Sequence, residues 1–136
     1  MRNFVLLLIA AVLLTACQTA PVKRTDASIA VKQGVSEITP QEARPAVDAA
    51  YAQFIDVRTP EEYNSAHAAH TRNIPLDTLP QNLDKLERNE PVYLICQTGV
   101  RSMKAAQMLN EVGFPQTVSI AGGTTAWQEA GFPMTK

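Results

Sequence analysis

The chain has 136 residues, of which 46% are hydrophobic and 18% charged, a composition that fits one ordinary globular domain and excludes a disordered or fibrous chain. Its 12 basic and 13 acidic residues give a formal net charge of −1. This charge is too close to zero to indicate nucleic acid or anionic lipid as a partner, and we expect no nucleic-acid binding.

Residues 1–16 are predicted to be a secretory signal rather than part of the fold. A short positive start precedes an apolar stretch at 4–14, which is too short to span a bilayer as a mature anchor. The stretch ends in "LTAC", which resembles the bacterial lipobox. The resemblance implies cleavage before Cys17, diacylglycerol on its sulfur and acylation of the new amino terminus. A conventional signal cut near Ala16 is the alternative.

The lipid on Cys17 is expected to anchor the protein to a membrane of the cell envelope, facing the periplasm. Two or more acyl chains hold a protein firmly on a bilayer. Gln18 stands where an Asp would resemble an inner-membrane retention signal, so we expect the outer membrane of a two-membrane bacterium. Residues 17–34 are polar, lack periodicity and are predicted to form a lipidated tether.

The folded domain is predicted to occupy residues 35–136, where short apolar runs alternate with helical patterns. "TPQE" at 39–42 combines an N-cap threonine, a proline at the first helical position and a glutamate that closes a capping box, so a helix should begin there. "AQFIDV" at 52–57 predicts a compact strand. "TPEE" at 59–62 repeats the helix-start pattern directly afterwards.

The middle of the domain contains the clearest strand. "NIPL" at 73–76 indicates a brief strand or turn, and three leucines predict one side of a helix that ends before Pro91: Leu79, Leu83 and Leu86. "PVYLIC" at 91–96 is a nearly continuous apolar run, typical of a strand that is buried on both faces. We therefore place it in the middle of the sheet.

A helix, a strand and a last helix complete the predicted order. The helix after Cys96 should bury one face and expose another, and Gly113 stands at its C-cap position. "TVSI" at 117–120 predicts a strand, and "GGTTAW" at 122–127 opens the last helix. The predicted buried face is Ala105, Ala106, Leu109 and Val112, and the predicted exposed face is Lys104, Gln107 and Glu111.

This alternation predicts an α/β fold: a four- to five-stranded, mostly parallel sheet with helices on both faces. In open parallel sheets, sites form outside the carboxyl ends of the strands. Cys96 ends the predicted central strand. With Cys17 lipidated, Cys96 has no cysteine partner in the exported domain, so it is either buried and inert or kept for its reactivity.

The loop "CQTGVR" is predicted to stabilise a thiolate. Successive backbone N–H groups at the start of a helix favour an anion. Gly99 gives the backbone freedom, the small Thr98 and Val100 should leave the amides accessible, and Arg101 adds a fixed positive charge. Such surroundings lower the pKa of a cysteine thiol, so Cys96 is predicted to be nucleophilic at neutral pH. The alternative is a small hydrophobic residue in the core.

The joint pattern of motifs resembles the single-domain rhodaneses, which move sulfane sulfur through a cysteine persulfide. The resemblance covers about residues 35–133. It is carried by "IDVR" with "TPEEY", by "NIPL", by "YLICQTGVRS" and by "AGG" with "AW" and "GFP". It implies an α/β domain with a parallel sheet, Cys96 as the sulfur carrier and the amides of Gln97, Thr98, Gly99, Val100 and Arg101 around the persulfide.

One segment departs from the family pattern. Where members often carry a glycine–histidine–isoleucine run with a later glycine–alanine pair, this chain has "AHAAHT" at 66–71. His67 matches the family histidine and is interpreted as mainly structural. Arg58 is a candidate for substrate binding, with a structural carboxylate pair as the alternative. Asp56 and Trp127 are interpreted as structural.

The resulting prediction is a sulfurtransferase that moves sulfur from a donor such as thiosulfate to a thiophilic acceptor, without a cofactor or metal and as a monomer. Two alternatives stay open. A catalytically silent binding module would use the same scaffold, and a phosphatase or arsenate-reductase-like enzyme would also use a cysteine and an arginine around a loop. Phosphatase-like loops place five residues between these two, whereas only residues 97–100 intervene here.

Overall fold

The computed structural model describes residues 33–136. The predicted signal, Cys17 and nearly all of the predicted tether lie outside the described residues. The first strand, β1 (Gly34–Ile38), begins at the last residue of the predicted tether. Within residues 33–136, every helix is too short or too polar to pass through a bilayer.

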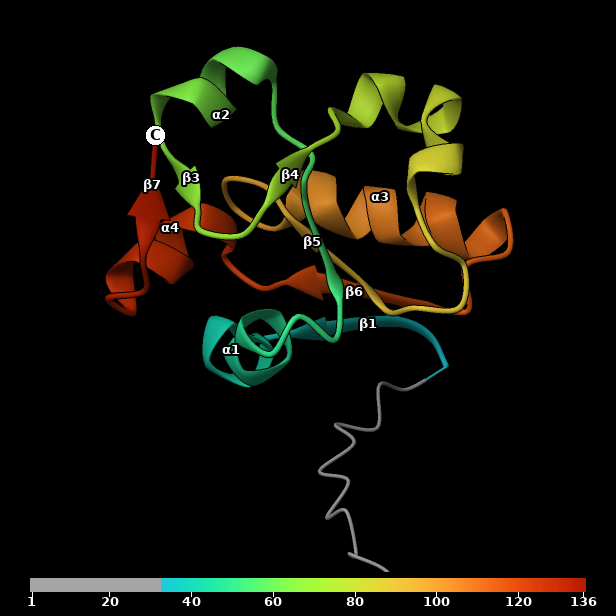
Figure 1. The fold of residues 1–136 in the computed structure, drawn as a ribbon, viewed down its shortest axis with the longest axis horizontal. Coiled ribbons are helices and arrows are strands. Elements are labelled where there is room, and N and C mark those ends of the chain that lie inside the picture. The colour runs from blue at the N-terminus through green and yellow to red at the C-terminus, as the bar shows by residue number, and fades with distance from the viewer. Residues whose placement is uncertain (1–32) are drawn as a thin grey trace, which may run out of the picture.

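Five parallel strands form the main sheet in the order β1-β6-β5-β2-β4 (Figure 1). The strand β5 (Val92–Ile95) pairs with β2 (Gln53–Asp56) on one side and with β6 (Gln116–Ile120) on the other. The edges are β1 and the short β4 (Arg72–Asn73). The structure thus confirms the predicted α/β class, the parallel sheet and the central position of the "PVYLIC" strand.

A second, two-stranded antiparallel sheet joins β3 (His67–Ala68) to β7 (Met134–Thr135). The sequence analysis predicted neither strand. Each strand has two residues, and a run of that length carries no alternation of apolar and polar positions from which a strand could be inferred.

Two helices begin with the capping boxes that the sequence predicts. In α1 (Pro40–Asp48) and in α2 (Pro60–Ser65), the N-cap threonine accepts a hydrogen bond from the backbone of the N3 glutamate. The glutamate side chain in turn accepts one from the N-cap backbone N–H. Each box satisfies two of the N–H groups that a helix start leaves without partners.

The sheet has a separate apolar core on each face, because successive residues of β5 point in opposite directions. Val92, Leu94 and Cys96 face the helix α3 (Val100–Glu111). Tyr93 and Ile95 face α1 and the last helix, α4 (Gly123–Glu129). Helices therefore cover both faces of the sheet, as predicted.

The predicted helix between residues 79 and 86 is wrong in type. The structure has two 3₁₀ segments there, η1 (Leu76–Gln81) and η2 (Leu83–Lys85). Pro80 lies inside η1 and has no N–H to donate, which disfavours a continuous α-helix. Leu79 and Leu86 are nevertheless buried in the core against α3.

The predicted buried face of α3 is correct except at Val112. Ala105, Ala106 and Leu109 are fully buried, but Val112 is 44% exposed. Val112 is the C-cap residue, just after the last helical residue, and the chain turns away at Gly113 with φ +96°. The helical spacing therefore no longer applies at Val112.

Trp127 should be the most costly core residue to truncate. It is 1% exposed, and its ring lies 5.2 Å from those of Phe54 and Phe132, measured between centroids. Replacing a buried Trp with Ala loses its burial and leaves a cavity, so we expect Trp127→Ala to lower the free energy of unfolding by about 3–5 kcal/mol. Urea denaturation followed by circular dichroism measures this.

The matched control is Tyr51→Ala, which truncates an aromatic side chain that is 75% exposed. Surface substitutions of this kind change stability by about 0.5 kcal/mol or less. Equal losses in the two variants would contradict the placement of Trp127 in the core.

Candidate active site

The thiol of Cys96 lies where the central strand meets a helix. β5 ends at Ile95, Cys96 follows directly, and α3 begins at Val100. The sulfur accepts a hydrogen bond from the backbone N–H of Gly99 at 3.1 Å. The predicted contact between the thiol and a loop amide is therefore present at the carboxyl edge of the parallel sheet.

Gly99 is needed at its position for two reasons. Its φ of +100° lies in the left-handed region, which side chains rarely adopt. A Cβ there would also come within 3.2 Å of the Gly122 nitrogen and 3.4 Å of the Ile120 oxygen. Glycine thus lets the loop turn its amide toward the sulfur while packing closely against the end of β6.

Two buried serines lie behind the sulfur. Ser102 of α3 has its Oγ 3.6 Å from the Cys96 Sγ and donates a hydrogen bond to the Gly99 carbonyl at 3.0 Å. Its Oγ is also 2.8 Å from the Oγ of Ser119 on β6. Both serines are fully buried.

The pKa of Cys96 lies below its ordinary value of 9.0. Burial raises the pKa of the thiol, but hydrogen bonds from the Ser102 hydroxyl and from the amides of Ser102, Thr98 and Gly99 together lower it by more. The direction agrees with the prediction of a stabilised thiolate. Since an unfolded cysteine keeps its ordinary pKa, the lowered pKa of Cys96 stabilises the fold above pH 9, and this contribution is lost as pH falls through the folded pKa.

The thiol is more enclosed than expected. Cys96 is only 1% exposed and belongs to the core cluster on the α3 face. The sequence predicts a nucleophilic thiol at Cys96, with a small buried hydrophobic residue as the alternative. The structure shows both features at once: the side chain is buried, yet its sulfur faces hydrogen-bond donors.

The start of α4 holds the backbone of the Cys96 loop in place. The amide of Thr124 donates to the Cys96 carbonyl at 2.7 Å, and the amide of Thr125 donates to the Gln97 carbonyl at 3.2 Å. A Cβ on Gly123 would lie 2.2 Å from the Cys96 oxygen, so only glycine permits this approach. These three residues were not predicted as part of the site.

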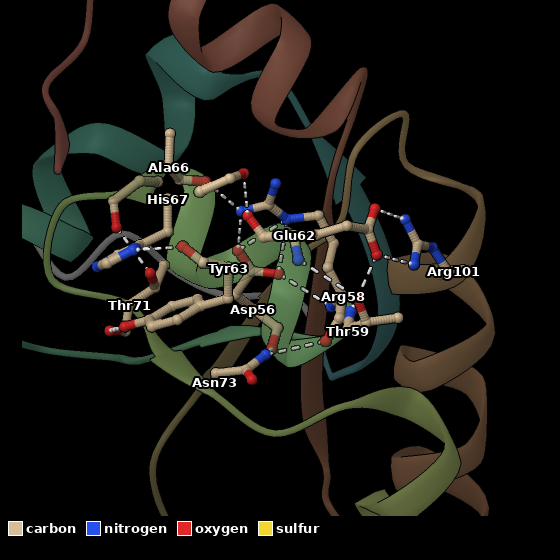
Figure 2. A network of polar contacts seen from close by, with 12 residues as sticks. Asp56, Arg58, Thr59, Glu62, Tyr63, Ala66, His67, Thr71, Asn73 and Arg101 are labelled. Atoms are coloured by element: carbon tan, nitrogen blue, oxygen red, sulfur yellow. Dashed lines mark hydrogen bonds and ion pairs between the residues drawn. The ribbon is translucent and has the colours of Figure 1, made fainter. Parts of the chain in front are cut away.

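Arg101 is committed to an ion pair, as Figure 2 shows. Its guanidinium donates two hydrogen bonds to the carboxylate of Glu62 on α2, at 2.7 and 2.8 Å. The guanidinium lowers the pKa of Glu62 to about 2, and the carboxylate raises the pKa of Arg101. The charge of Arg101 near the predicted thiolate is thus largely balanced by Glu62. The contact of Arg101 with a substrate stays a prediction.

Arg58 forms a second, deeper ion pair. Its guanidinium lies 2.7 Å from a carboxylate oxygen of Asp56, which is fully buried, and it also donates to the Ala66 carbonyl at 2.8 Å (Figure 2). This is the structural role that the sequence analysis weighed against substrate binding. Arg58 also lines a pocket, so its substrate contact stays a prediction.

The pocket lies beside the Cys96 loop and has a volume of about 570 Å³. Gln97 and Arg58 line it together with residues of α2 and α4 and with Met134, whereas Cys96 does not. Gln97, Thr98 and Val100 are exposed, and Val100 is 74% exposed. None of these three side chains is charged, so none places a charge near the sulfur.

His67 has contacts that fit the structural interpretation. Its ring stacks on Tyr63 at 3.7 Å between centroids, and its Nδ1 lies 2.9 Å from the Tyr63 carbonyl oxygen. Tyr63 donates its hydroxyl to the Thr71 carbonyl at 2.6 Å. This small network holds the "AHAAHT" segment, in which His70 adopts φ +69° at the place of a family glycine. Within residues 33–136, His, Cys, Asp and Glu form no cluster of three that could bind a metal.

A comparison with protein families decides the identity of the domain. The family model described as "Rhodanese-like domain" matches residues 39–130. The chain belongs to the rhodanese family. The crystal structure of a rhodanese-like domain protein from Staphylococcus aureus is 33% identical and has a TM-score of 0.64, covering 74% of this chain and 99% of that one. A rhodanese-related protein from Thermoplasma volcanium is 29% identical, with a TM-score of 0.67, covering 74% and 97%.

Two curated proteins are also similar in sequence. The uncharacterized protein YqhL of Bacillus subtilis is 43% identical over 76 residues, which cover 56% of this chain and 60% of that protein. The chain thus spans about three fifths of that relative's length. The thiosulfate sulfurtransferase GlpE of Vibrio cholerae is 32% identical over 83 residues, covering 61% of this chain and 78% of that protein.

Sequence reasoning missed Glu62 and the two serines. Glu62 was interpreted only as a cap, although an exposed glutamate at N3 has a second oxygen available for a partner. Ser102 follows Arg101 directly in the quoted rhodanese motif, and this adjacency was a usable signal. Ser119 gave no signal, because its contact with Ser102 depends on the packing of α3 against β6.

The ion pair between Glu62 and Arg101 should contribute to stability only while Glu62 is ionised. Its pKa of about 2 lies below the ordinary 4.5, so the contribution is full above pH 4.5 and is lost as pH falls through about 2. Glu62→Gln keeps a capping side chain but removes the charge. Because both partners are about one-third exposed, we expect a loss of about 1 kcal/mol or less near neutral pH, measured by urea denaturation.

The control is Glu61→Gln, which removes a neighbouring charge on the same helix without touching Arg101. The stability difference between wild type and Glu62→Gln should shrink as the pH is lowered toward 2. A difference that stays constant over that range, or one that Glu61→Gln reproduces, would show that the pair does not stabilise the fold.

Proposed function

We propose that this rhodanese is a sulfurtransferase that carries sulfane sulfur on Cys96 as a persulfide. The observation that supports this most directly is the hydrogen bond from the Gly99 N–H to the Cys96 sulfur. It is joined by the Ser102 hydroxyl, and both favour the thiolate. Relatives named thiosulfate sulfurtransferase support thiosulfate as the donor to test first.

The proposed reaction has two displacement steps. The Cys96 thiolate attacks the outer sulfur of thiosulfate, a new S–S bond forms, and the bond to the inner sulfur breaks as sulfite leaves with the electron pair. A nucleophilic acceptor, cyanide in an assay or a thiol in the cell, then attacks the outer sulfur of the persulfide. This step returns the Cys96 thiolate. A preformed thiolate needs no general base.

Loop donors stabilise the charges that these steps create. In the persulfide the negative charge moves to the outer sulfur, and we expect the loop amides to donate hydrogen bonds to it. The pair of Arg101 with Glu62 adds little net charge, so neutral dipoles carry most of the stabilisation. A small donor suits this site, because Cys96 is only 1% exposed.

One observation favours the second candidate, a silent binding module: the burial of Cys96 limits access to its sulfur. The phosphatase alternative gains no support, because the Arg101 guanidinium is bound to Glu62. A single measurement separates sulfur transfer from these alternatives.

Intact mass of the purified protein after incubation with thiosulfate is expected to increase by one sulfur atom. The increase should be absent in Cys96→Ser and should disappear on adding cyanide, with thiocyanate as the product. Cys17→Ser serves as the control, because it removes the other cysteine and should leave the increase intact. Wild type that gains no sulfur from any of several donors would support the binding module.

We further propose that the protein is a lipoprotein of the cell envelope, anchored through Cys17. The support is the "LTAC" sequence at the end of the apolar stretch. In bacterial cells fed radiolabelled palmitate, the wild-type protein should take up label and sediment with the outer membrane. Cys17→Ser should do neither, while Cys96→Ser should behave as wild type. Unlabelled wild-type protein in the soluble fraction would contradict the anchor.

A further inference from the structure

Two buried hydroxyl groups from different elements meet behind the Cys96 sulfur. Ser102 comes from the first turn of α3 and Ser119 from β6, and both are fully buried. Their oxygens are 2.8 Å apart, close enough for a strong hydrogen bond whichever serine donates. Only the Ser102 oxygen lies within hydrogen-bond reach of the sulfur, at 3.6 Å.

Each hydroxyl has one proton, and this limits what the pair can do at one time. Ser102 can donate to the Gly99 carbonyl at 3.0 Å or to the sulfur, but not to both. When Cys96 is a thiol, its S–H donates to the Ser102 oxygen and Ser102 donates to Gly99. When Cys96 is a thiolate, it can only accept, and Ser102 must turn its proton toward the sulfur.

Ser119 can make this turn possible in two ways. It lies 3.5 Å from the Gly99 carbonyl, which also accepts from the Met103 N–H at 3.1 Å, so the carbonyl keeps a donor after Ser102 turns away. Ser119 can alternatively donate to the Ser102 oxygen. A hydroxyl that accepts one hydrogen bond is a better donor in the next, because chains of hydrogen bonds polarise one another.

We propose that Ser119 is a positioning residue that acts through Ser102: it directs the Ser102 hydroxyl toward the Cys96 sulfur when that sulfur is negatively charged. This proposal rests on the proposed function in one respect: sulfur transfer would use the two charged forms of Cys96, the thiolate and the persulfide. Under this proposal, Ser119 on the neighbouring strand β6 favours the ionised form of Cys96 together with the loop amides.

The charged side chains nearest the loop are paired with one another, so an uncharged hydroxyl can influence the ionisation of Cys96. Arg101 on α3 is paired with Glu62 of α2, and Arg58 at the end of β2 is paired with Asp56. β6 carries no ionisable side chain, and the only one on α4 is Glu129 at its far end from the loop. Glu37 of β1, which is paired in register with Ser119, is exposed. The groups that hydrogen-bond the sulfur are therefore neutral donors.

The test measures the ionisation of Cys96 directly, from the pH dependence of its ultraviolet thiolate absorbance. Subtracting the Cys96→Ser protein removes the signals of tyrosines and of Cys17. We expect Ser119→Ala to move the midpoint upward, so that the thiolate-to-thiol ratio at a given pH falls about two- to tenfold, as for the loss of one hydrogen bond. Ser119→Thr keeps the hydroxyl and should restore much of the ratio.

A double substitution distinguishes a relay from a general effect on packing. If Ser119 acts through Ser102, then Ser102→Ala with Ser119→Ala should shift the midpoint no further than Ser102→Ala alone. The matched control is Thr117→Val. Thr117 is a buried residue on the same face of β6 that donates to the Ala106 carbonyl at 2.9 Å, two positions from Ser119. Thr117→Val should leave the midpoint of Cys96 ionisation unchanged, even if it lowers the stability of the fold.

A folded Ser119→Ala protein with the wild-type midpoint would overturn the proposal, as would additive shifts in the double variant. Circular dichroism establishes that each variant is folded. The outcome does not depend on sulfur transfer. A shifted midpoint in a protein that takes up no sulfur defeats the proposed function alone, and an unshifted midpoint in an active enzyme defeats only the role of Ser119.

Discussion

The close approach of α4 to the Cys96 loop is the constraint on which the site depends. The amides of Thr124 and Thr125 bind the carbonyls of Cys96 and Gln97, and Gly123 permits the contact because it has no Cβ. In a planar trans peptide, a carbonyl held on one side directs the next N–H to the other side. Fixing the Gln97 carbonyl toward α4 therefore turns the Thr98 amide toward the sulfur, where it helps to lower the pKa of the thiol.

The electrostatics of the site differ from the simple picture of a cysteine beside a free arginine. Both arginines near the loop are paired with carboxylates, Arg101 with Glu62 and Arg58 with Asp56. These pairs connect α2 to α3 and brace the end of β2, so their main effect is to fix elements in place. A thiolate on Cys96 would be stabilised mainly by neutral donors, whose hydrogen bonds are stronger in a buried site than in water.

The sequence predicted the features that depend on local pattern. The "TPQE" and "TPEE" helix starts, the "PVYLIC" strand and the position of Cys96 at its end all follow from neighbouring residues. The contacts of Arg101 with Glu62 and of Ser102 with Ser119 did not follow, because the tertiary fold brings these residues together. The α-helix predicted before Pro91 did not form, for a different reason. Apolar spacing indicates only which face is buried, and Pro80 disfavours a continuous α-helix at this place.

The burial of Cys96 and its lowered pKa are two results of one packing arrangement. A thiolate at the surface of an oxidising compartment is readily oxidised or captured by other thiols. At 1% exposure, Cys96 is shielded from large reagents, which suits the proposed place of this rhodanese in the cell envelope. Burial alone would keep the sulfur protonated, but the loop amides and the buried serine bring donors into the same enclosed space. The tight loop therefore combines close packing with hydrogen-bond donors around the same sulfur.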